Sequence, residues 1–169
     1  MKRMKKLMIF MVILAAFSAS AIAQVSATAS ATATIVSPIA IAKTVDMNFG
    51  NVAASAAAGT VVLTPAGTRS ATGGVTLPAT VGTVTAASFT VTGTAGYTYS
   101  ITLPGAPTTI TSGGNNMTVD TFTSNPTPTG TLTGGTSTLN VGATLNVGAN
   151  QAAGVYTSGT PFTVTVNYN

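Results

Sequence analysis

The chain contains no cysteine, no histidine and no tryptophan, and only two of its 169 residues are acidic. Without cysteine it can form no disulfide and carry no lipid on an N-terminal cysteine. Zinc and iron sites lack their usual nitrogen and sulfur ligands, and a Ser-His-Asp or Cys-His arrangement lacks its base. The two acidic residues are Asp46 and Asp120, and nothing beside them assigns one as acid and the other as base, as a glycosidase pair requires. We therefore expect no catalytic, metal or cofactor site.

Positive charge is also scarce once its position is considered. The whole chain carries a formal charge of +4 and has a calculated pI near 9.8, values that would suggest a nucleic-acid or anionic-membrane partner. Four of the six basic residues, however, stand within the first six positions, and beyond them Lys43 and Arg69 balance the two aspartates. A neutral chain has no basic patch with which to bind a phosphate backbone, so we exclude nucleic acid as a partner.

Residues 1–23 have the composition of a cleavable signal peptide. A basic start precedes an apolar run from Leu7 to Phe17, and small residues at Ala21 and Ala23 predict cleavage before Gln24. The alternative is a transmembrane anchor, but the run is shorter than the roughly 20 apolar residues that span a bilayer. No later run is long enough, so we expect a mature chain without a stable membrane span, exported to the periplasm, cell surface or extracellular space.

The rest of the chain is rich in residue types that suit strands, and the helix formers Glu, Lys, Arg and Gln are nearly absent. Apolar and hydroxyl side chains alternate in short runs separated by Gly and Pro turn signals, which predicts antiparallel sheets with one buried face. Residues 53–59 are expected to form a loop, and a turn is expected at Gly142-Ala143, between two similar segments. Besides apolar positions between Ile39 and Phe49, the predicted strands are Thr60–Thr64, Gly74–Leu77, Ala86–Thr92, Tyr97–Leu103, Met117–Thr123, Thr138–Val141 and Phe162–Tyr168.

Both ends of the mature chain have the two-residue alternation that is typical of extended strands. Between Val25 and Thr34, Ala or Val alternates with Ser or Thr, so residues 24–36 are either an extended N-terminal strand or a flexible leader before a domain at residues 37–169. At the other end, four apolar residues alternate with polar ones and form a strand that is either a plain sheet member or a pairing edge for another chain. These four are Phe162, Val164, Val166 and Tyr168.

Several segments together resemble a bacterial secreted family of unknown function, numbered 4402 among such domains. They are the stretch Ser37–Lys43, the motif from Asp46 to Val52, Gly154-Val155-Tyr156 and the closing Phe-Thr-Val-Thr-Val-Asn-Tyr. More distantly, the Asn-Phe-Gly-Asn-Val motif and the C-terminal strand are similar to subunits of chaperone–usher pili, which implies an immunoglobulin-like antiparallel β-sandwich. That resemblance implies a donor strand with its bulky residues at Val25, Ile35 and Val36, and a C-terminal strand that a periplasmic chaperone grips before identical subunits assemble.

These features lead to two functional expectations. The first is a secreted structural surface protein, a pilin-like subunit that assembles by strand exchange. The alternative is a monomeric secreted module that binds glycans or surfaces through loops containing Tyr97, Asn115, Asn116 and Asn125.

Overall fold

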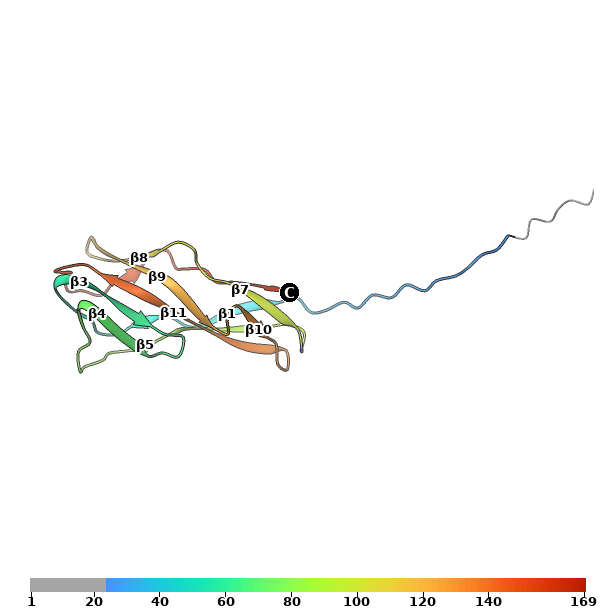
Figure 1. The fold of residues 1–169 in the computed structure, drawn as a ribbon, viewed down its shortest axis with the longest axis horizontal. Helices are drawn as coiled ribbons and strands as arrows, with labels where there is room; N and C mark the ends of the chain where they lie inside the picture. Colours follow the sequence, from blue (N-terminus) through green and yellow to red (C-terminus); the bar gives the residue numbers. More distant parts are fainter. Residues whose placement is uncertain (1–23) are drawn as a thin grey trace, which may run out of the picture. The chain divides into compact units, whose positions relative to one another are not determined.

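The computed structural model describes residues 24–169, and it contains strands but no helix in that range. The predicted signal peptide, including Ala21 and Ala23 at its cleavage site, lies outside the described residues. Figure 1 shows the strands gathered in the unit that runs from Ile35 to Asn169. No helix long and apolar enough to cross a bilayer is present from residue 24 onward.

Within residues 24–169, thirteen strands form three antiparallel sheets. They are β1 (Ala40–Val45), β2 (Asn48–Phe49), β3 (Ala53–Leu63), β4 (Arg69–Thr76), β5 (Val84–Thr85), β6 (Ala87–Thr92), β7 (Thr98–Thr102), β8 (Thr108–Ser112), β9 (Asn115–Asn125), β10 (Thr129–Thr131), β11 (Thr136–Val147), β12 (Thr157–Ser158) and β13 (Thr165–Tyr168).

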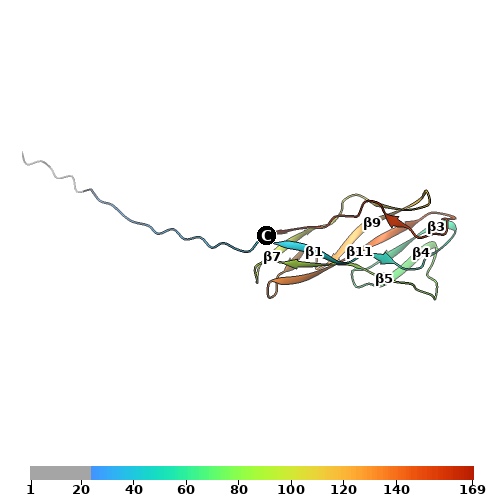
Figure 2. The same cartoon turned by 180° about the vertical axis from the view of Figure 1, so that it is seen from behind.

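The largest sheet has the order β1-β6-β11-β9-β8-β12, with the β3–β4 hairpin attached to β11. A second sheet has the order β10-β7-β13, and β2 pairs with β5 in a third. Figure 2 shows the same strands from behind. The long strand β11 organises the large sheet, because residues 136–141 pair with β6, residues 143–147 pair with β3, and its other edge pairs with β9.

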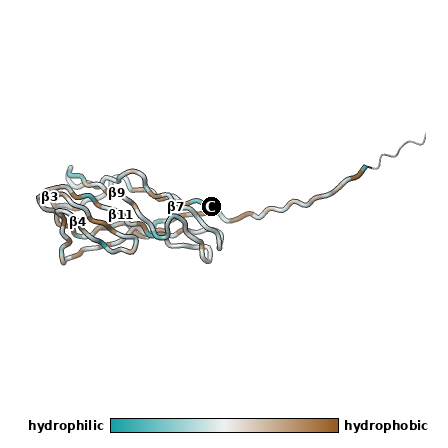
Figure 3. Tube along the Cα trace, viewed as in Figure 1, coloured by the Kyte–Doolittle hydropathy of each residue, from teal (hydrophilic) through white to brown (hydrophobic). Residues whose placement is uncertain are grey.

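The core consists of two hydrophobic clusters, and the first joins the large sheet to the β10-β7-β13 sheet. This β13 cluster has the buried members Ala87, Val91, Tyr99, Leu132, Leu139, Val141, Val164 and Val166. The second, which we call the β3–β4 cluster, has the buried members Val61, Val75, Val119, Ala143, Leu145 and Val147. Both fit an antiparallel β-sandwich, in which alternate residues face the interior. Figure 3 shows the corresponding mixture of hydrophobic and hydrophilic residues along the strands.

The predicted all-β class and antiparallel pairing are confirmed, but three local predictions are wrong. The C-terminal strand begins at Thr165 and not at Phe162. Residues 53–59 are not a loop, because they form the first part of β3, which pairs with β4 around an irregularity between Ala54 and Gly59. The chain also does not turn at Gly142-Ala143. Strand β11 continues through both residues, with an irregularity against β9 between Gly142 and Thr144. Gly142 is packed so closely on the backbone of Leu63 that a Cβ would not fit.

Candidate functional site

Two strands of the sandwich lie side by side without forming a ladder. Among the strands of residues 24–169, β1 pairs only with β6, and β13 pairs only with β7. The Cα atoms of β1 and β13 nevertheless lie no more than 8 Å apart where the two strands are nearest. We call the two facing edges the β1–β13 seam, formed by residues 39–43 of the first strand region and residues 164–168 of the second. Figure 2 shows β1 beginning beside the C-terminus.

The backbone groups that face the seam from β13 follow from the hydrogen bonds on its other edge. The Asn169 N–H donates to the Thr98 carbonyl at 3.2 Å, so residues 169, 167 and 165 direct their N–H and C=O groups toward β7. Because direction alternates along a strand, Val164, Val166 and Tyr168 direct theirs away from β7, on the edge of β13 that has no strand partner among the described residues. Of the four residues predicted for chain pairing, Val166 and Tyr168 lie in β13, and Val164 directly precedes it. The fourth, Phe162, precedes the strand and packs on Phe122, with ring centroids 4.9 Å apart.

The same reasoning defines the β1 side of the seam. The Gly93 N–H, directly after β6, donates to the Gly135 carbonyl at 3.0 Å. The backbone groups of residues 91 and 89 therefore also face β11, and those of residues 92 and 90 face β1. Ala40 and Ala42 are the partners of Thr92 and Thr90. The backbone groups of residues 39 and 41 are therefore directed away from β6, on the edge of β1 that has no strand partner among the described residues.

The side chains beside the seam already form a nearly closed core. Val164 is 8% exposed and Val166 is 7% exposed, and both belong to the β13 cluster. Ile39 and Ile41 pack against that cluster from β1. What the seam offers a further chain is therefore mainly backbone, with little uncovered apolar surface.

Tyr168 lies at one end of the seam and connects three segments. Its hydroxyl accepts from the Thr94 N–H at 2.7 Å and donates to the Ser37 carbonyl at 2.8 Å. Its ring packs edge-on against Tyr97, with centroids 5.6 Å apart. Sequence reasoning identified Tyr168 as part of a pairing strand but missed Ser37 and Thr94, because nothing in their local sequence indicates this contact.

The segment predicted as a donor strand has no strand partner among residues 24–169. No residue from Gln24 to Ile39 belongs to a strand. Val25 is 92% exposed and Ile35 is 93% exposed, while Val36 is of intermediate exposure. Two bulky apolar side chains of this segment therefore have almost no protein cover.

The residues proposed for glycan binding do not form one site. Asn115 and Asn116 begin β9, and Asn125 ends it. At the rise of an antiparallel strand these ends are roughly 30 Å apart. Tyr97 belongs to the loop before β7 and contacts Tyr168.

The two carboxylates have separate structural partners. Asp46 forms an exposed ion pair with Lys43, with 2.7 Å between Nζ and Oδ1. Asp120 accepts from the Asn146 amide at 2.9 Å and from the Thr121 hydroxyl at 3.0 Å. Among residues 24–169 no group of three potential metal ligands occurs.

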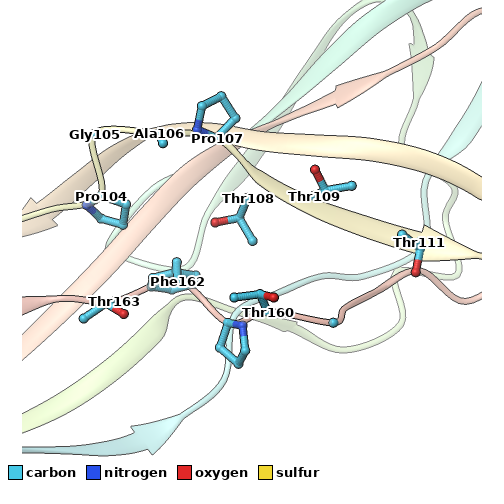
Figure 4. Close-up of a pocket in the computed structure, with 12 residues that line it drawn as sticks. Pro104, Gly105, Ala106, Pro107, Thr108, Thr109, Thr111, Thr160, Phe162 and Thr163 are labelled. Carbon is cyan, nitrogen blue, oxygen red and sulfur yellow. The ribbon is translucent and has the colours of Figure 1, made fainter.

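An open hollow of about 600 Å³ lies where the β7–β8 connection passes the segment before β13. Thr108 and Phe162 point into the space between these two segments (Figure 4). Its lining contains threonine, proline, glycine and alanine besides Phe162, and no charged residue. It contains neither carboxylate, so this hollow brings no reactive side chains together.

The hydrogen bonds of the Arg69 side chain were also not predicted from the sequence. Its guanidinium donates to the carbonyls of Phe49, Asn51 and Val81, the second at 2.7 Å and the third at 3.3 Å. The Asn-Phe-Gly-Asn-Val motif thus supplies two of the three carbonyls that bind this guanidinium. Its role in this structure is to hold a loop against β4.

Comparison with curated proteins and with solved structures finds no match. A family model described as a domain of unknown function, DUF4402, matches residues 39–168. This range begins at Ile39 and ends at Tyr168, so it includes both strands of the seam and leaves out residues 24–36. The match covers most of the chain, and the protein therefore belongs to the DUF4402 family.

Proposed function

We propose that this protein is an exported, non-enzymatic structural subunit of the cell surface that associates with identical subunits by strand addition at the β1–β13 seam. The observation that carries the proposal is the pair of strands that lie together while each is hydrogen-bonded on one edge only. Unpaired strand edges bind extended segments through backbone hydrogen bonds, without any reactive side chain.

The segment that fits the seam best is residues 24–36 of another copy. Its alternating pattern places Val25, the alanines and Ile35 on one face, and the hydroxyl residues on the other. Such a segment can direct small side chains toward the core and hydroxyls toward solvent. Transfer of the exposed Val25 and Ile35 side chains out of water would favour association.

The small size of the alanines matches the seam. Since Val164 and Val166 are already buried, large donor side chains would have little space. A strand inserted between two others also needs about 9.6 Å between its neighbours, twice the strand spacing. Because β1 and β13 come within 8 Å, insertion must part them, and we expect association to be slow.

The direct test uses the mature domain lacking residues 24–36 and a synthetic peptide of that sequence. We expect the truncated protein to be monomeric and to bind the peptide, raising its free energy of unfolding by about 2.7 kcal/mol at a peptide concentration one hundred times the Kd. The matched control is the same peptide with Ala29→Pro, which removes a backbone donor from the strand. Equal effects of the two peptides, or no effect of either, would refute strand addition.

Export is the second part of the proposal and has its own test. The basic start, apolar run and small residues before Gln24 support it. We expect the wild-type chain to be recovered outside the cytoplasm starting at Gln24, and an Ala23→Asp variant to retain its first 23 residues. N-terminal sequencing of fractionated cells measures both. A wild-type chain recovered uncut from the cytoplasm would contradict export.

A periplasmic chaperone is the expected partner before assembly. The pairing strand contains Val164, Val166 and Tyr168, and an unpaired edge of this kind promotes premature association unless it is covered. Capture of the newly exported chain by cross-linking should yield a chaperone bound at β13.

Asp46→Asn and Asp120→Asn test the non-enzymatic part of the proposal. Any hydrolytic activity of the protein that these substitutions abolish would disprove that part.

A further inference from the structure

Three residues at the end of the seam form a closed ring of hydrogen bonds. The Ser37 N–H donates to the Thr94 hydroxyl at 2.9 Å, and the Thr94 N–H donates to the Tyr168 hydroxyl at 2.7 Å. The Tyr168 hydroxyl then donates to the Ser37 carbonyl at 2.8 Å. Both backbone polar groups of Ser37 are therefore engaged, one by the loop after β6 and the other by the last strand.

This ring fixes the position at which the N-terminal segment joins the folded unit. Ser37 stands three residues before the first residue of β1, and Pro38 follows it directly. For residues 24–36 to enter the seam of their own chain, the backbone must reverse direction between Val36 and Ile39. Such a tight reversal changes the orientation of the Ser37 peptide groups and breaks the ring.

Pro38 opposes the same reversal. In a tight turn with Ser37 and Pro38 at its centre, proline would occupy the third position, where it is disfavoured in the common type I turn. The segment of a second copy has no such constraint, because its own Ser37 remains bound in its own domain. The ring therefore opposes entry of residues 24–36 into the seam of their own chain, but it does not oppose entry of the same residues from a second copy.

We infer that Ser37, Thr94 and Tyr168 act as a positioning clamp that prevents a chain from filling its own seam and so makes a second copy of this chain the partner. The inference rests on the proposed function. It adds that the partner is selected by the hydrogen bonds at Ser37, directly after residues 24–36. Tyr168 is a positioning residue in this clamp, acting through the Ser37 backbone.

The absence of cysteine makes the test direct. Ser30→Cys and Thr165→Cys, placed together in the mature chain, put one thiol on the hydroxyl side of the N-terminal segment and one on the outward side of β13. After mild oxidation, disulfides between chains report entry into a neighbour, and disulfides within a chain report entry into the chain's own seam. We expect mainly disulfides between chains.

Tyr168→Phe, added to this pair, removes two hydrogen bonds of the ring and keeps the aromatic ring. Thr94→Val removes the acceptor for the Ser37 N–H. We expect each variant to raise the fraction of disulfides within a chain severalfold, and their combination with Pro38→Gly to raise it further. Tyr97→Phe is the matched control, since it removes a hydroxyl beside Tyr168 that takes no part in the ring.

A second measurement examines the clamp without cysteines. Amide hydrogen exchange at Ser37 should be slow in the wild-type protein and about tenfold faster in Tyr168→Phe or Thr94→Val. An unprotected Ser37 amide in the wild type, or disulfides between chains in unchanged proportion in every variant, would overturn the clamp while leaving strand addition intact. Failure of all disulfides together with failure of the peptide to bind the truncated domain would instead overturn strand addition, and the clamp with it.

Discussion

The two hydrophobic clusters of this sandwich are closed in different ways. The β3–β4 cluster is covered by a hairpin whose strands pair along most of their length, and Arg69 fixes the neighbouring loop. The β13 cluster is equally buried, but it is bordered by β1 and β13, each of which lacks a neighbour on one edge within the described part of the chain. The comparison separates burial from backbone pairing. Among the described residues, the β3–β4 half ends in β4, a strand with one unpaired edge, whereas the β13 half brings two such strands, β1 and β13, within 8 Å of each other.

The largest expected loss of stability comes from matched leucine-to-alanine substitutions, one in each hydrophobic cluster. Leu139 and Leu145 are 0% and 2% exposed, lie on the same strand and belong to different clusters. Replacing either with alanine should lower the free energy of unfolding by about 3 kcal/mol, measured by denaturant unfolding. Only Leu139→Ala should also weaken binding of the 24–36 peptide, because Leu139 belongs to the cluster that the seam strands border. An equal loss of peptide affinity in both variants would contradict the division between the halves.

A smaller effect is expected from Arg69, which lies in β4 and so belongs to the β3–β4 half. Arg69→Met leaves three carbonyls without their donor and should cost about 2 kcal/mol, since hydrogen bonds to charged groups are worth more than neutral ones. Arg69→Lys should recover only part of this, because an ammonium group cannot reproduce the planar fork. Thermal unfolding measures both variants. Peptide affinity should stay at the wild-type value, and a marked drop would mean that the loop near Arg69 influences the seam.

The smallest effect is expected at the ion pair between Lys43 in β1 and Asp46 directly after it. The Lys43 and Asp46 side chains are 55% and 80% exposed, so Lys43→Met should change the free energy of unfolding by less than about 0.5 kcal/mol. Asp46→Asn is the matched variant from the other partner. Denaturant unfolding at low and high salt measures both. A loss above about 1 kcal/mol would show that this pair helps to hold β1 at the seam.

The strands with large alternating side chains could be predicted from sequence. The segments containing Phe89/Val91 and Tyr99/Ile101 are β6 and β7 as expected. Strand β8 was missed because Thr108–Ser112 contains a single large apolar residue and depends on pairing with β9. The loop predicted at residues 53–59 failed for a related reason. Small residues there are poor strand formers, but cross-strand pairing with β4 outweighs that preference.

The candidate site was only partly predictable. The alternation from Phe162 to Tyr168 identified the pairing strand, although the strand itself begins at Thr165. The neighbour of its free edge depends on strand order, which periodicity does not encode. The clamp is harder still to predict, since Ser37 and Tyr168 are 131 positions apart and are brought together by the packing of two different sheets.

Strand β11 adds a thermodynamic consequence to the contrast between the halves. Its twelve residues supply Leu139 and Val141 to one cluster and Ala143, Leu145 and Val147 to the other. Neither cluster can lose this strand while the other keeps its packing. Heat should therefore melt the domain in one step, with a calorimetric enthalpy equal to the van't Hoff enthalpy. A neighbour bound at the seam would then protect the distant β3–β4 hairpin as fully as the strands that it touches.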